Sequence, residues 1–304
     1  MADETGMQIG IDVGGTKLEA AALNADGAIV ARLRVPNPGS YDGCVHALVD
    51  LVAQIEAQIG ARGSVGVGLP GFTSPRDGLV RNANATFLNG RPVRDDLTTA
   101  LGRPVRVAND ANCMVLSEAV DGAGAAGRVV FGVIVGTGVG GGLVVDGRIV
   151  EGANGLGGEW GHLPVPWLRN EEADAACWCG QYGCMETMIS GTGFERVHRL
   201  RTGVSLSGPA ITAAARDGDG AARASLDSYV DRLGRALAMI VNIVDPDVIV
   251  LAGGMSNVSE IYAPLPAIVR AHVFGGVWDA PIVPARWGDS SGVRGAARLW
   301  PTTA

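Results

Sequence analysis

The sequence predicts an α/β fold made of two related lobes, and three observations carry this prediction. A strand, a glycine-rich turn, a second strand, a short turn and a third strand occur at residues 8–35, and the same succession returns at residues 129–150. Elsewhere helical patterns are mixed with strands, which is typical of α/β layers. The 46 glycines gather at strand ends, where they let the backbone come close to a ligand.

The first lobe begins with a buried strand that ends near Asp12, and its other elements follow from local patterns. An amphipathic helix is predicted at residues 41–59, because apolar side chains recur there at helical spacing. Residues 24–27 and 97–101 are interpreted as turns. The other predicted elements are a helix from 109 to about 120 and strands at 8–13, 18–23, 28–35, 64–69 and 105–107.

The second lobe contains the repeated hairpins and then becomes mostly helical. Residues 122–127 are small and flexible, so we place the lobe boundary there. Residues 1–121 then form a small N-terminal lobe, onto which a C-terminal helix within 291–304 packs back, and residues 122–290 form a large lobe. The predicted elements are strands at 129–135, 143–145, 148–150, 248–251 and 281–285 and helices at 186–200, 209–216, 221–244, 258–273 and 291–299.

Three cysteines and one histidine lie close together in the second lobe. Cys177, Cys179 and Cys184 fall within an eight-residue window, and His162 lies a short loop upstream. Three thiolates and one imidazole supply the closed tetrahedral shell that a structural zinc ion prefers. Nearby glycines let a short loop bend its sulfurs toward one point. The sequence therefore predicts a zinc site.

Two carboxylates, Glu159 and Glu186, flank these ligands, and neither is needed to complete the shell. We interpret the metal as a brace that holds both carboxylates and His162 in place. A disulfide is an alternative, although Cys177 and Cys179 are too close in sequence to pair easily and an odd cysteine would remain. A purely structural zinc loop, in which the glutamates have no role, is another.

Two glycine turns between antiparallel strands could offer rows of backbone N–H groups to phosphate oxygens. Neither fits a Walker A or a dinucleotide fingerprint, and each taken alone could be only a tight turn. Their duplicated positions favour nucleotide binding, as does a glycine pair after a later strand, where an adenosine could lie. The residues concerned are Gly14, Gly15 and Thr16, then Gly136, Thr137, Gly138 and Gly140, and finally Gly253 and Gly254.

Charged side chains border the first of these turns. Asp12 accepts hydrogen bonds only and stands at a strand tip, so it is a candidate partner of Mg²⁺ through water. Lys17 could neutralise phosphate, although a surface lysine in this position is equally ordinary.

The pair Asn109-Asp110 stands where a strand gives way to a helix. A carboxylate placed there can accept a proton from an attacking hydroxyl group, while the adjacent amide fixes the hydroxyls beside it. Asp110 could also cap the helix, and capping does not exclude catalysis.

Five motifs in this order resemble the ROK family of sugar kinases, repressors and related open reading frames, and the resemblance covers essentially the whole chain. The motifs start at Asp12, Asn109, Gly136, Gly158 and Cys177, and they read DVGGTK, NDAN, GTGVGGG, GEWGH and CWCGQYGCME. The resemblance implies an actin-like, ribonuclease-H-like pair of lobes, with ATP and Mg²⁺ in the cleft and phosphorylation of a hexose at its 6-hydroxyl group.

The same resemblance implies roles for single residues. Asp110 would be the base, and the zinc ligands would be His162 and the three clustered cysteines. Sugar hydroxyls would be held by Asn82, Asn109, Asp110, Glu159, His162 and Glu186. The sequences flanking these motifs look most like bacterial fructokinases of the mannofructokinase type, which favours D-fructose, with N-acetylglucosamine kinase or glucokinase as alternatives within the family.

The sequence disfavours two function classes other than a kinase. A sugar-responsive repressor would carry a helix-turn-helix ahead of the first strand, and we expect no room for one because that strand starts at about residue 8. A net charge of −7 also disfavours binding to DNA. A sugar-binding protein without chemistry is disfavoured by Asp110 and the paired glycine turns. The polar, acidic start and the lack of a long apolar run favour a cytoplasmic protein without a membrane partner. A homodimer is left open.

Overall fold

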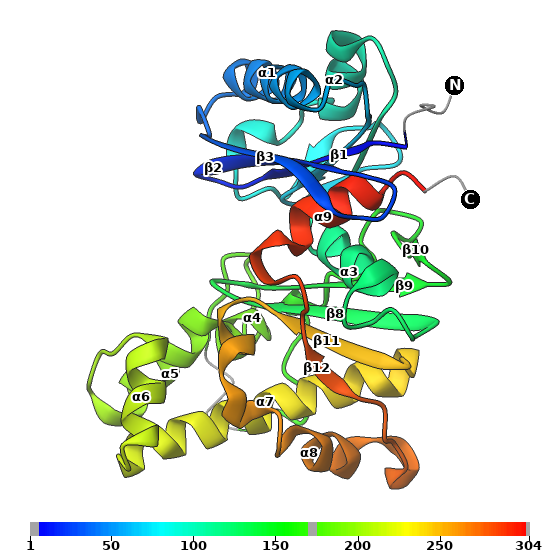
Figure 1. Cartoon of the computed structure of the whole chain (residues 1–304). Helices are drawn as coiled ribbons and strands as arrows, with labels where there is room; N and C mark the ends of the chain where they lie inside the picture. The colour runs from blue at the N-terminus through cyan, green and yellow to red at the C-terminus, as the bar shows by residue number, and fades with distance from the viewer. Residues whose placement is uncertain (1–5, 170–174, 302–304) are drawn as a thin grey trace. The chain divides into compact units, whose positions relative to one another are not determined.

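The computed structural model describes residues 6–169 and 175–301. Internal contacts divide the chain into two compact units (Figure 1). Unit 1 consists of Met1–Ala125, Gly142–Gly157 and Arg286–Ala304, and unit 2 consists of Ala126–Gly141 and Gly158–Ala285. The lobe boundary that we expect near residue 122 stays a prediction. Residues 1–5 lie outside the described part. So do residues 302–304, which are the last three of the expected 291–304 segment.

Unit 1 is built on a five-stranded sheet with the order β3-β2-β1-β4-β7. β1 pairs antiparallel with β2 and parallel with β4, and β4 pairs parallel with β7. The strands are β1 (Gln8–Val13), β2 (Lys17–Leu23), β3 (Ile29–Pro36), β4 (Ser64–Leu69), the short pair β5 (Phe72–Thr73) and β6 (Val80–Arg81), and β7 (Val105–Asn109). The helices are α1 (Tyr41–Ile59), η1 (Thr86–Leu88), α2 (Val93–Leu101), α3 (Asp110–Asp121), η7 (Gly288–Ser290) and α9 (Ser291–Arg298).

The two central strands of this sheet have one face of branched side chains and one face of glycines. Ile9 and Ile11 belong to a buried core that also includes residues of α1 and α2. Gly10 and Gly66 face the other way, toward α9. A Cβ atom at Gly10 would lie 2.0 Å from the Val293 carbonyl oxygen, so the helix backbone rests directly on the glycine face. Figure 1 shows α1 and α2 on one side of this sheet and α9 on the other.

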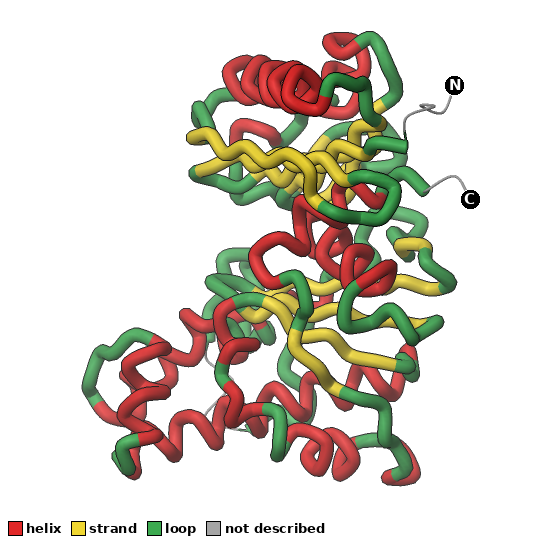
Figure 2. The backbone as a smooth tube through the Cα atoms, viewed as in Figure 1, coloured by secondary structure: helices red, strands yellow, loops and turns green. Residues whose placement is uncertain are grey.

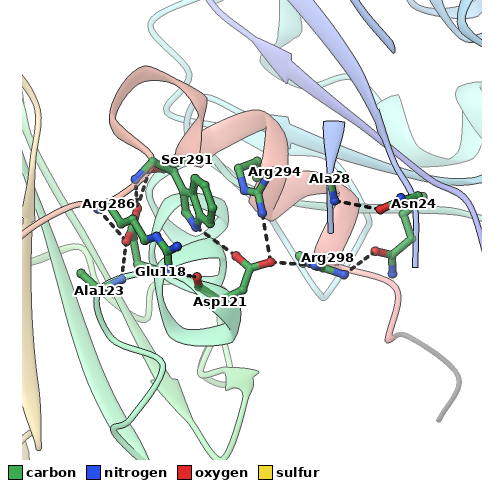
Figure 3. Close-up of polar contacts among 11 residues, drawn as sticks. Asn24, Ala28, Glu118, Asp121, Ala123, Arg286, Ser291, Arg294 and Arg298 are labelled. Atoms are coloured by element: carbon green, nitrogen blue, oxygen red, sulfur yellow. Dashed lines mark hydrogen bonds and ion pairs between the residues drawn. The ribbon is translucent and has the colours of Figure 1, made fainter. Parts of the chain in front are cut away.

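Two acids at the end of α3, the buried Glu118 and the partly buried Asp121, bind the returning C-terminal segment within unit 1 (Figure 3). Glu118 is fully buried, and its carboxylate accepts hydrogen bonds from the backbone N–H groups of Ala123, Arg286 and Trp287 and from the Ser291 hydroxyl, at 2.8–3.0 Å. Asp121 pairs with Arg294 at 3.0 Å and with Arg298 at 2.6 Å. These donors satisfy the carboxylates of Glu118 and Asp121, so the C-terminal segment is held against α3 by polar as well as apolar contacts.

The second five-stranded sheet has the order β10-β9-β8-β11-β12, in which β8, β11 and β12 are parallel. Its strands are β8 (Val129–Val135), β9 (Val139–Val145), β10 (Arg148–Ile149), β11 (Val248–Ala252) and β12 (Ile282–Pro284). The helices of unit 2 are η2 (Trp160–His162), α4 (Glu186–Ile189), α5 (Gly191–Thr202), α6 (Gly208–Arg216), α7 (Gly220–Val244), η4 (Gly254–Asn257), η5 (Ser259–Ile261), α8 (Leu265–His272) and η6 (Phe274–Gly276). Figure 2 shows how strands and helices succeed one another along the tube.

Helix α7 supplies much of the core of unit 2, as its apolar sequence predicts. Tyr229, Leu233 and Leu237 are fully buried. Gly234 lets α8 approach, because a Cβ atom there would come within 2.5 Å of the Ile268 side chain. The end of the helix breaks the pattern, where Ile243 is 71% exposed.

Four predicted elements differ from the observed ones. The strand expected at 143–145 is the second half of β9, which begins at Val139, inside the stretch expected as a glycine turn. The expected turn at 97–101 is the end of α2, which starts at Val93 because this residue and Leu97 bury one face together. The expected helix at 186–200 is split at Ser190, whose hydroxyl accepts from the Gly193 N–H group at 2.9 Å and caps α5. The expected helix at 258–273 is also split, and Pro264 stands just before the part that continues as α8.

Among the described residues, none of the helices is both long enough and apolar enough to cross a lipid bilayer.

Candidate active site and metal centre

In unit 1 the predicted nucleotide and catalytic residues meet at one edge of the sheet. Asp12 at the end of β1 pairs with Gly68 of the parallel strand β4, and the next residue of β4 pairs with Asn109 at the end of β7. Carboxyl ends of parallel strands lie along the same edge, where α/β proteins bind their ligands. Burial raises the pKa of the Cys113 thiol well above its usual value, and the negative charges of Asp12 and Asp110 raise it further, so both acids lie near this sulfur.

The first glycine turn is held in shape by the chain that follows β3. The Gly14 N–H group donates to the Lys17 carbonyl at 2.9 Å, which closes the turn. The Asn37 side chain donates to the Gly14 carbonyl at 2.7 Å, and the Asn37 N–H group donates to the Thr16 carbonyl at 2.9 Å. Gly15, Thr16 and Lys17 are exposed, so their backbone groups and the lysine side chain are accessible to a ligand.

Asp12 has the charge environment of a cation site. Burial and the nearby Glu19 carboxylate raise its pKa to about 6, while Lys17 opposes this rise. Gly292 of α9 packs against it, since a Cβ atom there would lie 3.1 Å from the Asp12 carboxylate. A carboxylate that is costly to ionise inside the protein gains most from a divalent cation, so Asp12 fits the Mg²⁺ role expected of it.

We expect Asp12→Asn to stabilise the protein at pH 8 by about 1–3 kcal/mol in metal-free buffer, because the mutation removes a half-buried charge. The folded-state pKa of about 6 lies above the ordinary value of 3.8, so ionisation costs stability as the pH rises through 6. The difference should vanish below pH 3.8, where both proteins are uncharged at this position. Urea unfolding at pH 8 and at about pH 3 measures it.

The exposed Asp26→Asn variant is the control for Asp12→Asn, and its stability should not change at either pH. A destabilised Asp12→Asn protein at pH 8 would contradict the charge argument.

Asn109 and Asp110 make different contacts at the start of α3. Asn109 is the N-cap, and its side-chain oxygen accepts from the N–H groups of Ala111 at 2.8 Å and Asn112 at 3.2 Å. Asp110 is the first residue of the helix, and its carboxylate also accepts from the Ala111 N–H group at 2.8 Å. The cap is therefore Asn109, and the positive end of the helix stabilises the Asp110 carboxylate.

Asn82 joins this group through Gly71. The Asn109 amide donates to the Gly71 carbonyl at 2.8 Å, and Gly71 lies against the backbone of Arg81, Asn82 and Ala83. Asn82 adopts a φ of 54°, a conformation that asparagine tolerates better than most residues. The structure thus brings the three predicted sugar-binding residues of unit 1 into one neighbourhood.

In unit 2 the four predicted metal ligands come together. Their ligand atoms all lie within 4.8 Å of one another. The His162 Nδ1 atom lies 3.6 Å from the Cys177 sulfur, and the Cys179 and Cys184 sulfurs are 3.7 Å apart. Backbone pairing shapes the loop, for the Cys177 N–H group donates to the Gln181 carbonyl at 2.8 Å.

These separations fit a zinc ion. With Zn–S bonds of about 2.3 Å, two sulfurs of a regular tetrahedron lie about 3.8 Å apart. All five cysteines are free thiols, so the structure contains no disulfide that would compete for the cluster. Because Nδ1 of His162 faces the thiols, its Nε2 atom stays free for another partner.

Glu186 follows the last cysteine and connects the cluster to the second glycine turn. One of its carboxylate oxygens accepts from the Val139 N–H group at 3.1 Å, and the other accepts from the Trp178 indole N–H group. Gly138 makes room for it, because a Cβ atom there would lie 2.6 Å from the carboxylate. Burial raises the pKa of Glu159, with His162 opposing and Glu186 adding to the rise, so the two glutamates share one neighbourhood.

The second glycine turn is tied to the segments on both sides of it. The Gly191 N–H group donates to the Gly136 carbonyl at 2.7 Å, and the Thr192 hydroxyl donates to the Thr137 carbonyl at 2.8 Å. The Trp160 indole N–H group donates to the Gly140 carbonyl at 2.9 Å. Gly253 packs beside the turn, because a Cβ atom there would lie 2.7 Å from the Val135 carbonyl, and Gly254 follows it at the start of η4.

Several positioning residues are missing from the sequence-based predictions. Asn37 holds the first turn and Thr192 holds the second, yet each lies far along the chain from the group it fixes. Trp160 and Trp178 lie inside the GEWGH and CWCGQYGCME motifs. Their position beside predicted ligands could have identified them as positioning residues.

The chain is similar to known proteins over nearly its whole length. Residues 8–303 match the ROK family. The chain is 42% identical to an N-acetyl-D-glucosamine kinase of Pectobacterium atrosepticum, covering 96% of this chain and 98% of that protein. It is also 42% identical to the N-acetylgalactosamine kinase AgaK of a Shewanella species, covering 96% of each. The crystal structure of a ROK hexokinase from Thermus thermophilus superposes with a TM-score of 0.85 at 32% identity, covering 96% of each chain.

Proposed function

Because this chain belongs to the ROK family and is a sugar kinase, we propose that it transfers the γ-phosphate of ATP to the 6-hydroxyl group of a 2-acetamido-2-deoxyhexose, with N-acetyl-D-glucosamine preferred. Two relatives at 42% identity, each matched over 96% of this chain, are kinases of N-acetylhexosamines by name. This similarity carries the proposal. N-acetylgalactosamine is the second candidate, since its kinase is equally similar.

The expectation of fructose from the flanking motifs is not supported by these relatives. Flanking segments such as residues 288–297 lie in η7 and α9, where they pack against the sheet and α3 of unit 1. Segments that pack in the core reflect the architecture that a family shares. Specificity for one sugar depends instead on a few hydroxyl contacts and on the volume of the pocket.

We assign the chemical step to Asp110. Its carboxylate accepts the proton of the 6-hydroxyl group, the sugar oxygen forms a bond to the γ-phosphorus, and the bond from that phosphorus to the β,γ-bridging oxygen breaks and releases ADP. Asn109 keeps Asp110 at the helix start, while Glu159, His162 and Glu186 hold hydroxyl groups. Mg²⁺, which Asp12 would hold through water, supplies positive charge to the phosphates.

The proposal is tested by ADP release from the purified protein with Mg-ATP and, separately, N-acetylglucosamine, N-acetylgalactosamine, glucose, mannose and fructose. We expect the largest kcat/KM for N-acetylglucosamine, and phosphorus NMR of the product should place the phosphate at the 6-position. A larger value for fructose would overturn the proposed sugar but not the kinase. If no sugar releases ADP, the proposed reaction is wrong.

We further propose that the cluster of His162, Cys177, Cys179 and Cys184 holds one zinc ion that braces the sugar-binding residues. The purified protein should contain about one zinc per chain. Cys184→Ser should lose this zinc and most sugar turnover, because removing one ligand opens the shell and frees Glu186. Elemental analysis by mass spectrometry measures the metal content.

The control for Cys184→Ser is Cys44→Ala, which changes a buried thiol of α1 in unit 1 and should keep both the zinc and the turnover. Full turnover in a zinc-free Cys184→Ser protein would show that the metal does not brace the sugar site.

A further inference from the structure

Trp178 stands between two of the predicted metal ligands, Cys177 and Cys179, and this residue is 68% exposed. Large aromatic side chains are usually buried, where they contribute most to stability. Trp178 departs from this pattern. Its contacts within unit 2 supply an explanation.

Within the described part of the chain, the indole makes a hydrogen bond and a ring contact with two residues that would hold the sugar. Its N–H group donates to one carboxylate oxygen of Glu186. The ring meets the His162 imidazole edge to face, with the ring centroids 4.9 Å apart and the planes at 88°. Because Trp178 stays largely exposed, these contacts stabilise the protein little through burial. Their effect is to orient Glu186 and His162.

Glu186 is held from two sides by these interactions. The Val139 N–H group binds one of its oxygens at 3.1 Å, and Trp178 binds the other. Each carboxylate oxygen has two lone pairs, so each can still accept a hydrogen bond from a sugar hydroxyl group. Without Trp178, the carboxylate could rotate about the remaining bond, and sugar binding would have to stop that rotation at an entropic cost.

We propose that Trp178 is a positioning residue that fixes the Glu186 carboxylate, and with it the His162 ring, in the orientation that binds the sugar. The inference rests on the proposed function, in which Glu186 and His162 hold sugar hydroxyls. It adds a residue that does not itself take part in the chemistry and that acts through Glu186. Its effect should appear in sugar affinity, because Glu186 holds the sugar equally in the ground state and in the transition state.

Trp178→Phe is the direct test, since phenylalanine keeps an aromatic ring for His162 while it removes the N–H donor together with part of the indole. We expect the KM for N-acetylglucosamine to rise by about tenfold, because a hydrogen bond to a charged acceptor is lost. The kcat, the KM for ATP, the zinc content and the unfolding temperature should change little. Trp178→Ala, which also removes the ring contact with His162, should raise the sugar KM further.

The chain offers a matched control in Tyr182, an aromatic residue of the same cysteine loop that is also 68% exposed. Tyr182→Phe removes a polar group from the same loop, and it should leave the sugar KM unchanged. Equal KM values for wild type and Trp178→Phe would overturn the inference. So would a KM increase that is accompanied by zinc loss or an equal increase in Tyr182→Phe, since either would show a general effect on the loop.

The outcome for wild type separates the two proposals. A wild-type protein that phosphorylates N-acetylglucosamine while Trp178→Phe behaves identically refutes only the role of Trp178. A wild-type protein that neither binds nor phosphorylates any of the sugars refutes the proposed function, and the role of Trp178 in sugar binding with it.

Discussion

Asp110→Asn is expected to lower kcat for sugar phosphorylation by about 10²–10⁴-fold, the usual contribution of a general base. Asparagine has nearly the same shape, and its side-chain oxygen can accept the same hydrogen bond from the Ala111 N–H group that the Asp110 carboxylate accepts at 2.8 Å. An amide cannot take the proton of the sugar hydroxyl at neutral pH. The fold and the zinc content should therefore stay intact while turnover is lost.

The measurement is kcat from ADP release at saturating N-acetylglucosamine and ATP, together with the unfolding temperature and the zinc content of each protein. Asp219→Asn is a matched control, because Asp219 is also an acid at a helix start, where its carboxylate accepts from the Ala221 and Ala222 N–H groups at 2.8 Å. Asparagine caps helices as well as aspartate does, so this control should keep full activity. Turnover of Asp110→Asn within threefold of wild type would show that another group takes the proton.

Gly295→Ala should destabilise the protein by about 3 kcal/mol or more, because α9 and α3 leave no room for a methyl group. A Cβ atom at Gly295 would lie 1.6 Å from the Cys113 carbonyl oxygen and 2.3 Å from its carbon. These are backbone atoms of a helix, so they cannot turn away as a flexible side chain would. The two helices must move apart, and α9 then no longer packs closely against the glycine face of the sheet.

Thermal unfolding measures this effect, and we expect the midpoint to fall by on the order of 10 °C. Gly220→Ala is the control, because Gly220 is also a helical glycine, at the start of α7, and a Cβ atom there meets nothing within 4 Å. That variant should be as stable as wild type or slightly more stable. A Gly295→Ala protein as stable as Gly220→Ala would show that α9 and α3 pack less closely than the structure has them.

The activity of Gly295→Ala should fall together with its stability. Asp12 lies against Gly292 of α9, and Asp110 begins α3, so the two helices that would separate also support two predicted site residues. A fold defect at Gly295 is therefore distinguishable from Asp110→Asn, in which kcat falls and the midpoint does not.

The sequence by itself determined those features that short stretches of chain encode. The alternating strands, the long helix α7 and the two glycine turns are all present, because side-chain periodicity and turn chemistry act over a few residues. The four metal ligands were also identifiable, because three of them lie within one loop and thiolates with an imidazole are a characteristic zinc set. Order and spacing of the motifs were sufficient for the family.

The tertiary structure alone decided which distant residues meet. Position 295 requires glycine because the carbonyl group of residue 113 lies against it. Glu118 accepts a hydrogen bond from the N–H group of residue 286. No local sequence pattern encodes such pairs. The same holds for the candidate site residues of each unit, since Asn37 shapes the first glycine turn in unit 1 and Trp178 binds Glu186 in unit 2. A side chain's role depends on the donors and acceptors that folding brings within about 3 Å, and sequence distance does not report that separation.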